Sequence, residues 1–338
     1  MININKLLSH EKKNSKNIFN LFLFIYLILG LFLSVNTGVS TDAFIEEKIW
    51  KNNFEAVKDI FGYDNDGYSN LLQKHDKYYG VGYNFLSQIY LFFASILFKF
   101  DGLSDEISKV LLKHSFIFLT FFSSALIAKK IVNLIIKDEF YSNIFLVFFL
   151  FYPYLLGHGF YNPKDIPFLF AWLLCTYISF KIFLKIYSGK NITTFNIFLF
   201  SLSTAFLLSI RITGVLIFIQ YIITFIITSN FLKKSFYEMI KIYLGKISLF
   251  SVAVLLLLII FYPIFWKNPL LIFDSIFEAT NIQYGVCTLT MGKCMDSLDL
   301  PASYIFIWLI FKLPLISLIG FSLFPLVEKK IFSQSINQ

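Results

Sequence analysis

Three ionisable side chains, His158, Lys164 and Asp165, lie together in the stretch GHGFYNPKDIPFLFAWLL, residues 157–174. This stretch joins two apolar runs, so its charges fall where one run ends and the next begins. Charged groups near a membrane core are costly, and those that occur there tend to mark functional sites. A lysine can hold a phosphate, and a carboxylate can take the proton of an attacking hydroxyl. The residue types therefore predict phosphate binding and general-base chemistry at this junction.

Two other junctions between apolar runs carry the same kinds of side chain. Asp42 and Glu46 lie one helical turn apart just after the first run, in NTGVSTDAFIEEKIW, residues 36–50. Arg211 is the only arginine of the chain and falls between two later runs, in SIRITG. Its guanidinium fork matches the geometry of phosphate oxygens. These carboxylates and cations would form one site if the helices bring the three junctions to the same face of a membrane.

A simpler structural role is open to each of these residues. Asp165 could cap the helix that begins after Pro163, because a carboxylate there accepts free backbone N–H groups. Thr41 or Asp42 could cap the helix that follows the first apolar run. Arg211 could extend toward a lipid headgroup. Capping does not explain why a histidine, a lysine and an aspartate gather at one turn.

The composition predicts the elements that must position this site. Of the 338 residues, 57% are hydrophobic and 15% are charged, and the mean hydropathy is +0.70. A soluble domain rarely has so large an apolar share, so we predict an all-α, polytopic membrane protein with about eight transmembrane helices. Runs of about 20 apolar residues place these spans at 18–34, 110–130, 139–157, 166–186, 193–210, 212–230, 247–266 and 303–325. The stretch 83–100 either spans or lies along the interface as an amphipathic helix.

The positions of the lysines favour the interfacial alternative. If 83–100 does not cross, the short lysine-rich loops all share the side of the basic N-terminus, which the positive-inside rule places in the cytoplasm. These lysines are Lys129, Lys130, Lys137, Lys181, Lys185, Lys190, Lys233, Lys234, Lys241, Lys246, Lys329 and Lys330. If 83–100 crosses, the rule fails. The net charge of +8 then lies at the cytoplasmic face and gives no reason to expect nucleic-acid binding.

The same topology predicts the domain organisation. Residues 1–17 form a basic cytoplasmic N-terminus, and residues 18–330 form a single membrane-embedded domain. Within that domain, 35–109 is a long first extracytoplasmic loop with interfacial helices, and 267–302 is a second extracytoplasmic loop. All three charged junctions then face the outside.

The order of these features resembles the glycosyltransferase C superfamily, most of all its bacterial branch related to protein O-mannosyltransferases and aminoarabinose transferases. Members have an acidic residue just after the first span, flat helices in a long first loop, and an Asp at the outer end of a later span. NPKDIPFLFAWLL resembles the RPD-type motif of that branch, with Asp165 as its Asp, and RITG is similar to a segment where members often carry Lys or Arg. YPIFWKNPLLIF and DLPASYIFIWLIFKLPL resemble the loop and span that follow the core, so the resemblance runs from about residue 15 to 325.

This resemblance implies inverting transfer of a sugar from a polyprenyl-phosphate donor to an extracytoplasmic acceptor, which would be a protein, lipid or glycan. Asp42 would carry the first-loop acid and act as base, although Ala43 follows where members usually have a second acid, so Glu46 could share the role. Asp165 would position Lys164, the acceptor or a metal ion, and a divalent cation is the one cofactor considered. His158, Lys164 and Arg211 would bind the donor phosphate. The implied location is a bacterial inner membrane, with the N-terminus cytoplasmic and the active site periplasmic.

Two other functions remain open from the sequence. A transporter or lipid flippase would carry charges near mid-span, and Lys312 is the only charge that the predicted topology places well inside a span. A non-catalytic fragment of a longer transferase would share all the features above. Cys287 and Cys294 enclose a short loop on the oxidising side, which favours a disulfide over two reduced thiols.

Overall fold

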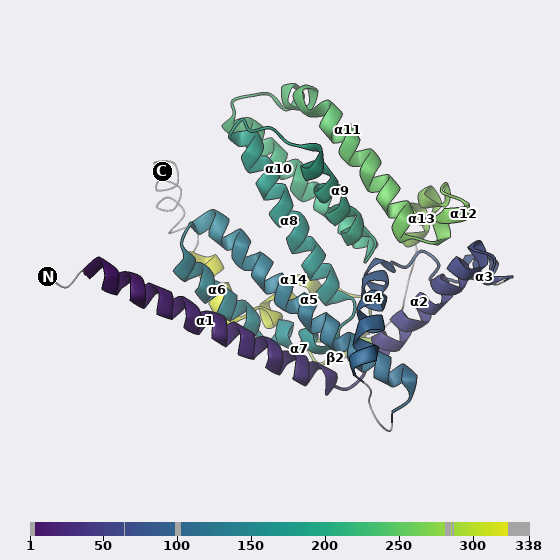
Figure 1. The fold of residues 1–338 in the computed structure, drawn as a ribbon. Coiled ribbons are helices and arrows are strands. Elements are labelled where there is room, and N and C mark those ends of the chain that lie inside the picture. The colour runs from purple at the N-terminus through teal and green to yellow at the C-terminus, as the bar shows by residue number, and fades with distance from the viewer. Residues whose placement is uncertain (1–3, 64, 99–102, 281–284, 286, 324–338) are drawn as a thin grey trace. The chain divides into compact units, whose positions relative to one another are not determined.

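The computed structural model describes residues 4–63, 65–98, 103–280, 285 and 287–323, and it is nearly all-α (Figure 1). The chain divides into two compact units, one up to Ile276 and one from Phe277. Each unit is described by itself.

The first unit is built from helices alone in the part of the chain that the structure describes. They are α1 (Ile4–Val35), α2 (Thr41–Ile60), α3 (Gly67–Leu72), α4 (Gly82–Leu97), α5 (Asp105–Ile136), α6 (Glu139–Phe151), α7 (Pro153–Tyr161), α8 (Asp165–Tyr187), α9 (Thr194–Leu208), the 3₁₀ helix η1 (Ile212–Leu216), α10 (Ile217–Phe231), α11 (Phe236–Phe261), α12 (Ile264–Lys267) and α13 (Leu271–Thr280), which crosses the boundary between the units. The main apolar core lies where α5, α6, α8 and α9 meet.

Among the described residues, five helices are long and apolar enough to cross a membrane. They are Lys16–Val35, Asp105–Ile136, Asp165–Tyr187, Ile212–Phe231 and Phe236–Phe261. Two bent helix pairs raise the number to seven if each pair is one span. The remaining predicted span, 193–210, forms α9, whose 15 residues rise about 22 Å, less than the ~30 Å core of a bilayer. The count of about eight spans stays a prediction.

Proline interrupts three segments that the sequence predicts as continuous spans. In 247–266, α11 ends at Phe261 and α12 begins after Pro263, and two other segments are bent. The predicted span 139–157 bends by 61° between α6 and α7, where Pro153 begins the new helix. The predicted span 303–325 bends by 110° after α14 (Tyr304–Lys312), at Pro314. Proline lacks a backbone N–H and pushes the preceding residue out of the helical region. Lys312, which the sequence places well inside a span, is the last residue of α14 and lies at this bend, so its place inside a span stays a prediction.

The helices α1 and α5 lie side by side and run antiparallel (Figure 1). Gly30 of α1 lies against Phe118 of α5, and Phe19 lies 5.7 Å from Lys129 Nζ, measured to the ring centroid. The chain from residue 36 to 104 therefore leaves and returns at one end of the bundle. Within that segment, α4 packs on the first part of α5. This is the arrangement expected if 83–100 lies along an interface.

The two ends of the bundle differ in their charged residues. The end reached by the C-termini of α1, α7, α9 and α11 and by the N-termini of α5 and α8 holds Glu46, Lys164, Asp165 and Arg211, and we call it the site end. The opposite end consists of the C-terminal part of α5 from residue 129 and the turns at 137–138, 188–193 and 232–235, and we call it the lysine-rich end. Lys246 and Lys185 bond there to Asn191 and Asn196, at 3.2 and 2.7 Å.

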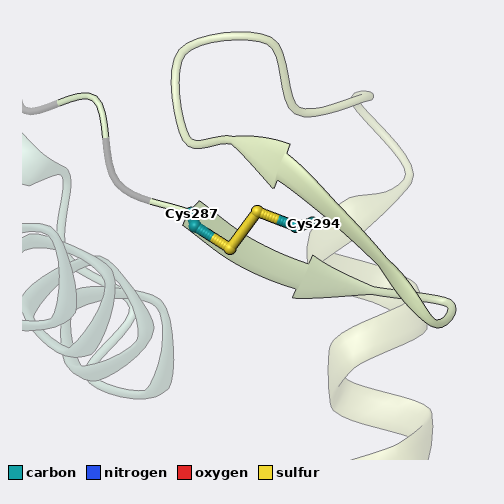
Figure 2. The surroundings of a disulfide bond; sticks show 2 residues. All are labelled: Cys287 and Cys294. Carbon is teal, nitrogen blue, oxygen red and sulfur yellow. A yellow bond between two sulfur atoms is a disulfide. The ribbon is translucent and has the colours of Figure 1, made fainter.

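The second unit contains a two-stranded antiparallel hairpin, β1 (Cys287–Thr290) and β2 (Lys293–Asp296). Met291 and Gly292 join the strands with φ of 49° and 80°, as a type I′ turn requires. A disulfide links Cys287 to Cys294 across the hairpin (Figure 2), which is the pairing that the sequence favoured.

Candidate functional site

Two ion pairs form the centre of the site and join all three charged junctions of the sequence. Lys164 Nζ lies 3.4 Å from Glu46 Oε1, so the α7–α8 connection meets the start of α2. Arg211 Nη2 lies 2.7 Å from Asp165 Oδ1, so the segment after α9 meets the start of α8. The expectation that these residues share one face is thus met by their geometry.

Asn162 organises the α7–α8 connection, and the sequence analysis did not identify it. Its Oδ1 accepts the backbone N–H groups of Lys164 and Asp165, at 3.0 and 2.8 Å. Its Nδ2 donates to Asp165 Oδ2 at 3.0 Å and lies 2.9 Å from His158 Nδ1. The capping role predicted for Asp165 therefore belongs to Asn162, and the Asp165 carboxylate is directed toward Arg211. The signal in the sequence was an asparagine before a proline at a helix start.

The start of α2 separates its two acids by burial. Ser40 is the N-cap, because its hydroxyl oxygen accepts the N–H of Ala43 at 3.3 Å, so the cap predicted at Thr41 or Asp42 is wrong. Asp42 lies in the first turn and is exposed. Glu46 is only 5% exposed. Solvent therefore reaches the Asp42 carboxylate much more readily than that of Glu46.

Burial raises the pKa of the Glu46 carboxyl above its ordinary value, and the nearby positive charges of Lys164 and Lys113 oppose that rise. Burial also lowers the pKa of the Lys164 ammonium, against the attraction of Glu46. Each shift has the sign that desolvation imposes on a charged group. Both charges are therefore held at a cost in solvation, and an anionic ligand beside Lys164 would offset the cost for the ammonium alone.

Lys164 and Arg211 each contact an aromatic ring as well as a carboxylate. Lys164 Nζ lies 3.8 Å from the centroid of the Tyr79 ring, a cation–π contact. The Arg211 guanidinium lies 6.0 Å from the centroid of the Phe168 ring. The Nε of Arg211 is buried and has no hydrogen-bond partner among the described residues. A buried donor of this kind is costly unless it is paired, so Arg211 retains capacity for an anionic oxygen.

Two glycines bring the segment before α4 against the end of α9. The backbone N–H of Gly82 donates to Ser209 O at 3.0 Å. A Cβ added to Gly80 would lie 2.3 Å from that carbonyl oxygen, and one added to Gly82 would lie 1.8 Å from Ser209 Oγ. Only glycine permits such a close approach. The contact places Tyr79, which precedes Gly80, and Arg211, which lies two residues after Ser209, at the same site.

A third ion pair, between Lys113 and Glu47, was not predicted from the sequence. Lys113 of α5 is only 4% exposed, donates to Asn84 Oδ1 at 2.5 Å, and lies 3.7 Å from Glu47 Oε2. It falls inside the predicted span 110–130, where a lone lysine in an apolar run is itself a functional signal. Positive and negative groups therefore alternate from α5 through α2 to the α7–α8 connection.

No cluster of three or more His, Cys, Asp or Glu side chains that could hold a metal ion occurs among the described residues. Cys287 and Cys294 belong to the second unit. The chain matches no protein-family model, no curated protein and no solved structure. The functional interpretation therefore depends on the side chains themselves: two cations beside an open carboxylate, at one end of a helical bundle.

Proposed function

We propose that the protein is an integral-membrane glycosyltransferase that moves a sugar from a polyprenyl-phosphate donor to an acceptor outside the cytoplasm. The observation that carries this proposal is Arg211, whose buried Nε has no partner among the described residues and which lies in one site with Lys164, Glu46 and Asp165. The positive-inside rule supports a cytoplasmic lysine-rich end and an extracytoplasmic site end. The location proposed is the inner membrane of a bacterium, with the N-terminus cytoplasmic and the site facing the periplasm.

In the proposed reaction, an acceptor hydroxyl attacks the anomeric carbon on the face opposite the phosphate. The bond from that carbon to the phosphate oxygen breaks, and its electron pair leaves with the polyprenyl phosphate. Arg211 and Lys164 stabilise the leaving phosphate, with His158 nearby. The hydroxyl proton passes to a carboxylate, and the configuration at the sugar inverts.

Exposure favours Asp42 as the base. Asp42 is exposed, and its negative charge favours the charged form of the Lys164 ammonium. Glu46 is buried and engaged with Lys164, which suits it to hold that lysine in place. If Glu46 rather than Asp42 accepts the proton, the base moves by one helical turn along α2.

The pair between Arg211 and Asp165 is easily exchanged for a pair with phosphate. The two side chains are 34% and 48% exposed, and an ion pair this exposed contributes about 0–1 kcal/mol. Asp165 keeps its hydrogen bond from Asn162 when Arg211 turns to the donor. Among the described residues no cluster of three or more metal-binding side chains includes Asp165, so a divalent cation there would need further ligands from the donor. Adding a chelator to the assay below tests for it.

The test is a transfer assay with the full-length protein in lipid nanodiscs and a panel of polyprenyl-phosphate sugars. Release of polyprenyl phosphate and labelling of an acceptor are both expected. Arg211→Ala should raise the apparent KM for the donor by about tenfold or more, since a charged hydrogen bond contributes about 1.5–3 kcal/mol, and Arg211→Lys should recover part of the loss. If folded wild-type protein releases polyprenyl phosphate from none of the donors, the proposal is overturned.

A membrane flippase is the second candidate, because Lys113 is buried within the candidate span Asp105–Ile136. It lies near the site end of α5, and α4 covers it there, which favours chemistry at one surface over transit through the membrane. A lipid-scrambling assay separates the flippase from the glycosyltransferase. It uses vesicles made of the same lipids as the nanodiscs. Scrambling of lipid-linked sugar without transfer would support the flippase. A protein that shows neither scrambling nor transfer would be a non-catalytic fragment.

A further inference from the structure

A large groove lies at the lysine-rich end, between α1, the C-terminal part of α5, and α6. Its volume is about 1090 Å³, and its walls are mainly apolar, with Phe19, Phe22, Ile144 and Val147 among them. It is separate from the candidate site. Lys129 of the groove is about 24 Å along α5 from Lys113, at ~1.5 Å per residue.

The groove carries a few polar groups on its apolar walls. Lys16 and Lys129 contribute two positive charges, and Glu139 contributes one negative charge. Asn143 also lines the groove, and its Oδ1 is buried without a hydrogen-bond partner among the described residues. A ligand that satisfies these groups has an apolar chain, an anionic group for the lysines, and a hydrogen-bond donor for the amide oxygen.

We propose that this groove binds an anionic phospholipid with a hydroxylated headgroup, such as phosphatidylglycerol, from the leaflet at the lysine-rich end. An acyl chain lies along the apolar walls, the phosphate is held by Lys16 and Lys129, and a headgroup hydroxyl donates to Asn143 Oδ1. Charge complementarity selects this lipid. The lysines outnumber the single carboxylate, and a choline headgroup adds a positive charge and has no hydrogen bond to donate.

The inference depends on membrane insertion and is independent of sugar transfer. The test uses full-length protein in detergent, with binding of added lipid measured by native mass spectrometry and by thermal shift. Phosphatidylglycerol should bind at least severalfold more tightly than phosphatidylcholine and should raise Tm. Lys129→Gln and Lys16→Gln should each weaken that binding by about fivefold. Asn143→Ala should reduce the preference for the hydroxylated headgroup.

Lys130→Gln is the matched control, because Lys130 is the exposed neighbour of Lys129 and does not line the groove. It should leave phosphatidylglycerol binding unchanged. Ile144→Trp should fill the groove and weaken binding of every phospholipid in protein that keeps its helical circular-dichroism spectrum. Equal binding of the two lipids, or equal losses in Lys129→Gln and Lys130→Gln, would overturn the proposal. Stabilisation by free glycerol phosphate equal to that by the lipid would also overturn it, because it would indicate a small-anion site.

Discussion

Asp42 and Glu46 lie one turn apart on α2, but their different surroundings suit them to different roles. Asp42 faces solvent, whereas Glu46 is buried against Lys164. Replacing either with its amide removes a charge without changing size. The two substitutions therefore separate proton transfer from the positioning of a cation.

Asp42→Asn should accumulate normally in the membrane, keep its Tm and bind donor, but transfer sugar about 10²–10⁴-fold more slowly, because an amide cannot take the proton. Initial rates and donor KM measured on purified protein check this. An active Asp42→Asn combined with an inactive Glu46→Gln would move the base to Glu46. If both variants transfer at the wild-type rate, neither carboxylate is the base.

Glu46 should also give the protein a characteristic pH dependence of stability. Its pKa is raised in the folded state, so the folded protein holds the proton more tightly than the unfolded chain does. The stability from this group is complete below the unfolded pKa of about 4.3 and is lost as pH rises through the folded pKa. When Tm is measured from pH 4 to 7, the Glu46→Gln variant should lack the part of the decline in Tm that Glu46 causes in the wild type. Glu55→Gln, an exposed position on the same helix, should leave the slope unchanged, and identical slopes in all three proteins would contradict the argument.

Asn162→Ala should both lower Tm and weaken donor binding, since its side chain caps α8 and holds Asp165. Loss of a cap costs about 0.5–2 kcal/mol. Asn162→Asp keeps oxygen acceptors for the two backbone N–H groups but loses the donor to Asp165 and places a like charge beside it. Tm should therefore recover more than donor KM does. Recovery of both would show that the link to Asp165 is unimportant.

At the scale of elements, the contact between α9 and the segment before α4 determines where Arg211 and Tyr79 lie. Gly80→Ala places a Cβ 2.3 Å from a carbonyl oxygen, so backbone must shift, at a cost of about 1–3 kcal/mol. Tm should fall and donor KM should rise. Gly157→Ala is the control, because its Cβ would meet nothing within 4 Å. Equal Tm values for the two variants would show that the contact tolerates displacement.

The sequence predicted the positions of the helices better than it predicted their bends. Each of the eight predicted spans corresponds to a helix or a bent pair, because a long apolar run is a strong signal. The breaks at Pro153 and Pro314 were visible as residues, but the bend angles depend on packing. The sequence predicted that Lys164 and Glu46 lie at the same membrane face, but it could not predict that the two side chains form an ion pair. Lys113 was missed because its partners, Asn84 and Glu47, are distant in the sequence. Asn162 was missed although its partners all lie within four residues of it and an asparagine before a proline is a local signal.

At the scale of the whole molecule, the opposite placement of acids and lysines predicts an orientation in the membrane. A cysteine at position 66 should react with a membrane-impermeant thiol reagent in intact cells, and one at position 234 should react only after permeabilisation. Asp66 and Lys234 are both exposed, so each substitution reports access rather than burial. The reverse labelling pattern would place the candidate site in the cytoplasm and overturn the proposed function with it.

The shortness of α9 has a consequence for access to the site. A helix of 15 residues falls about 8 Å short of the hydrocarbon thickness. Its last residues, from Ser203 to Leu208, are buried among neighbouring helices, so protein and not lipid surrounds the end of α9. If the other end of α9 lies at the membrane surface, Arg211 would lie in a recess of the protein below the opposite surface. An acceptor would then have to reach down into that recess to meet the donor.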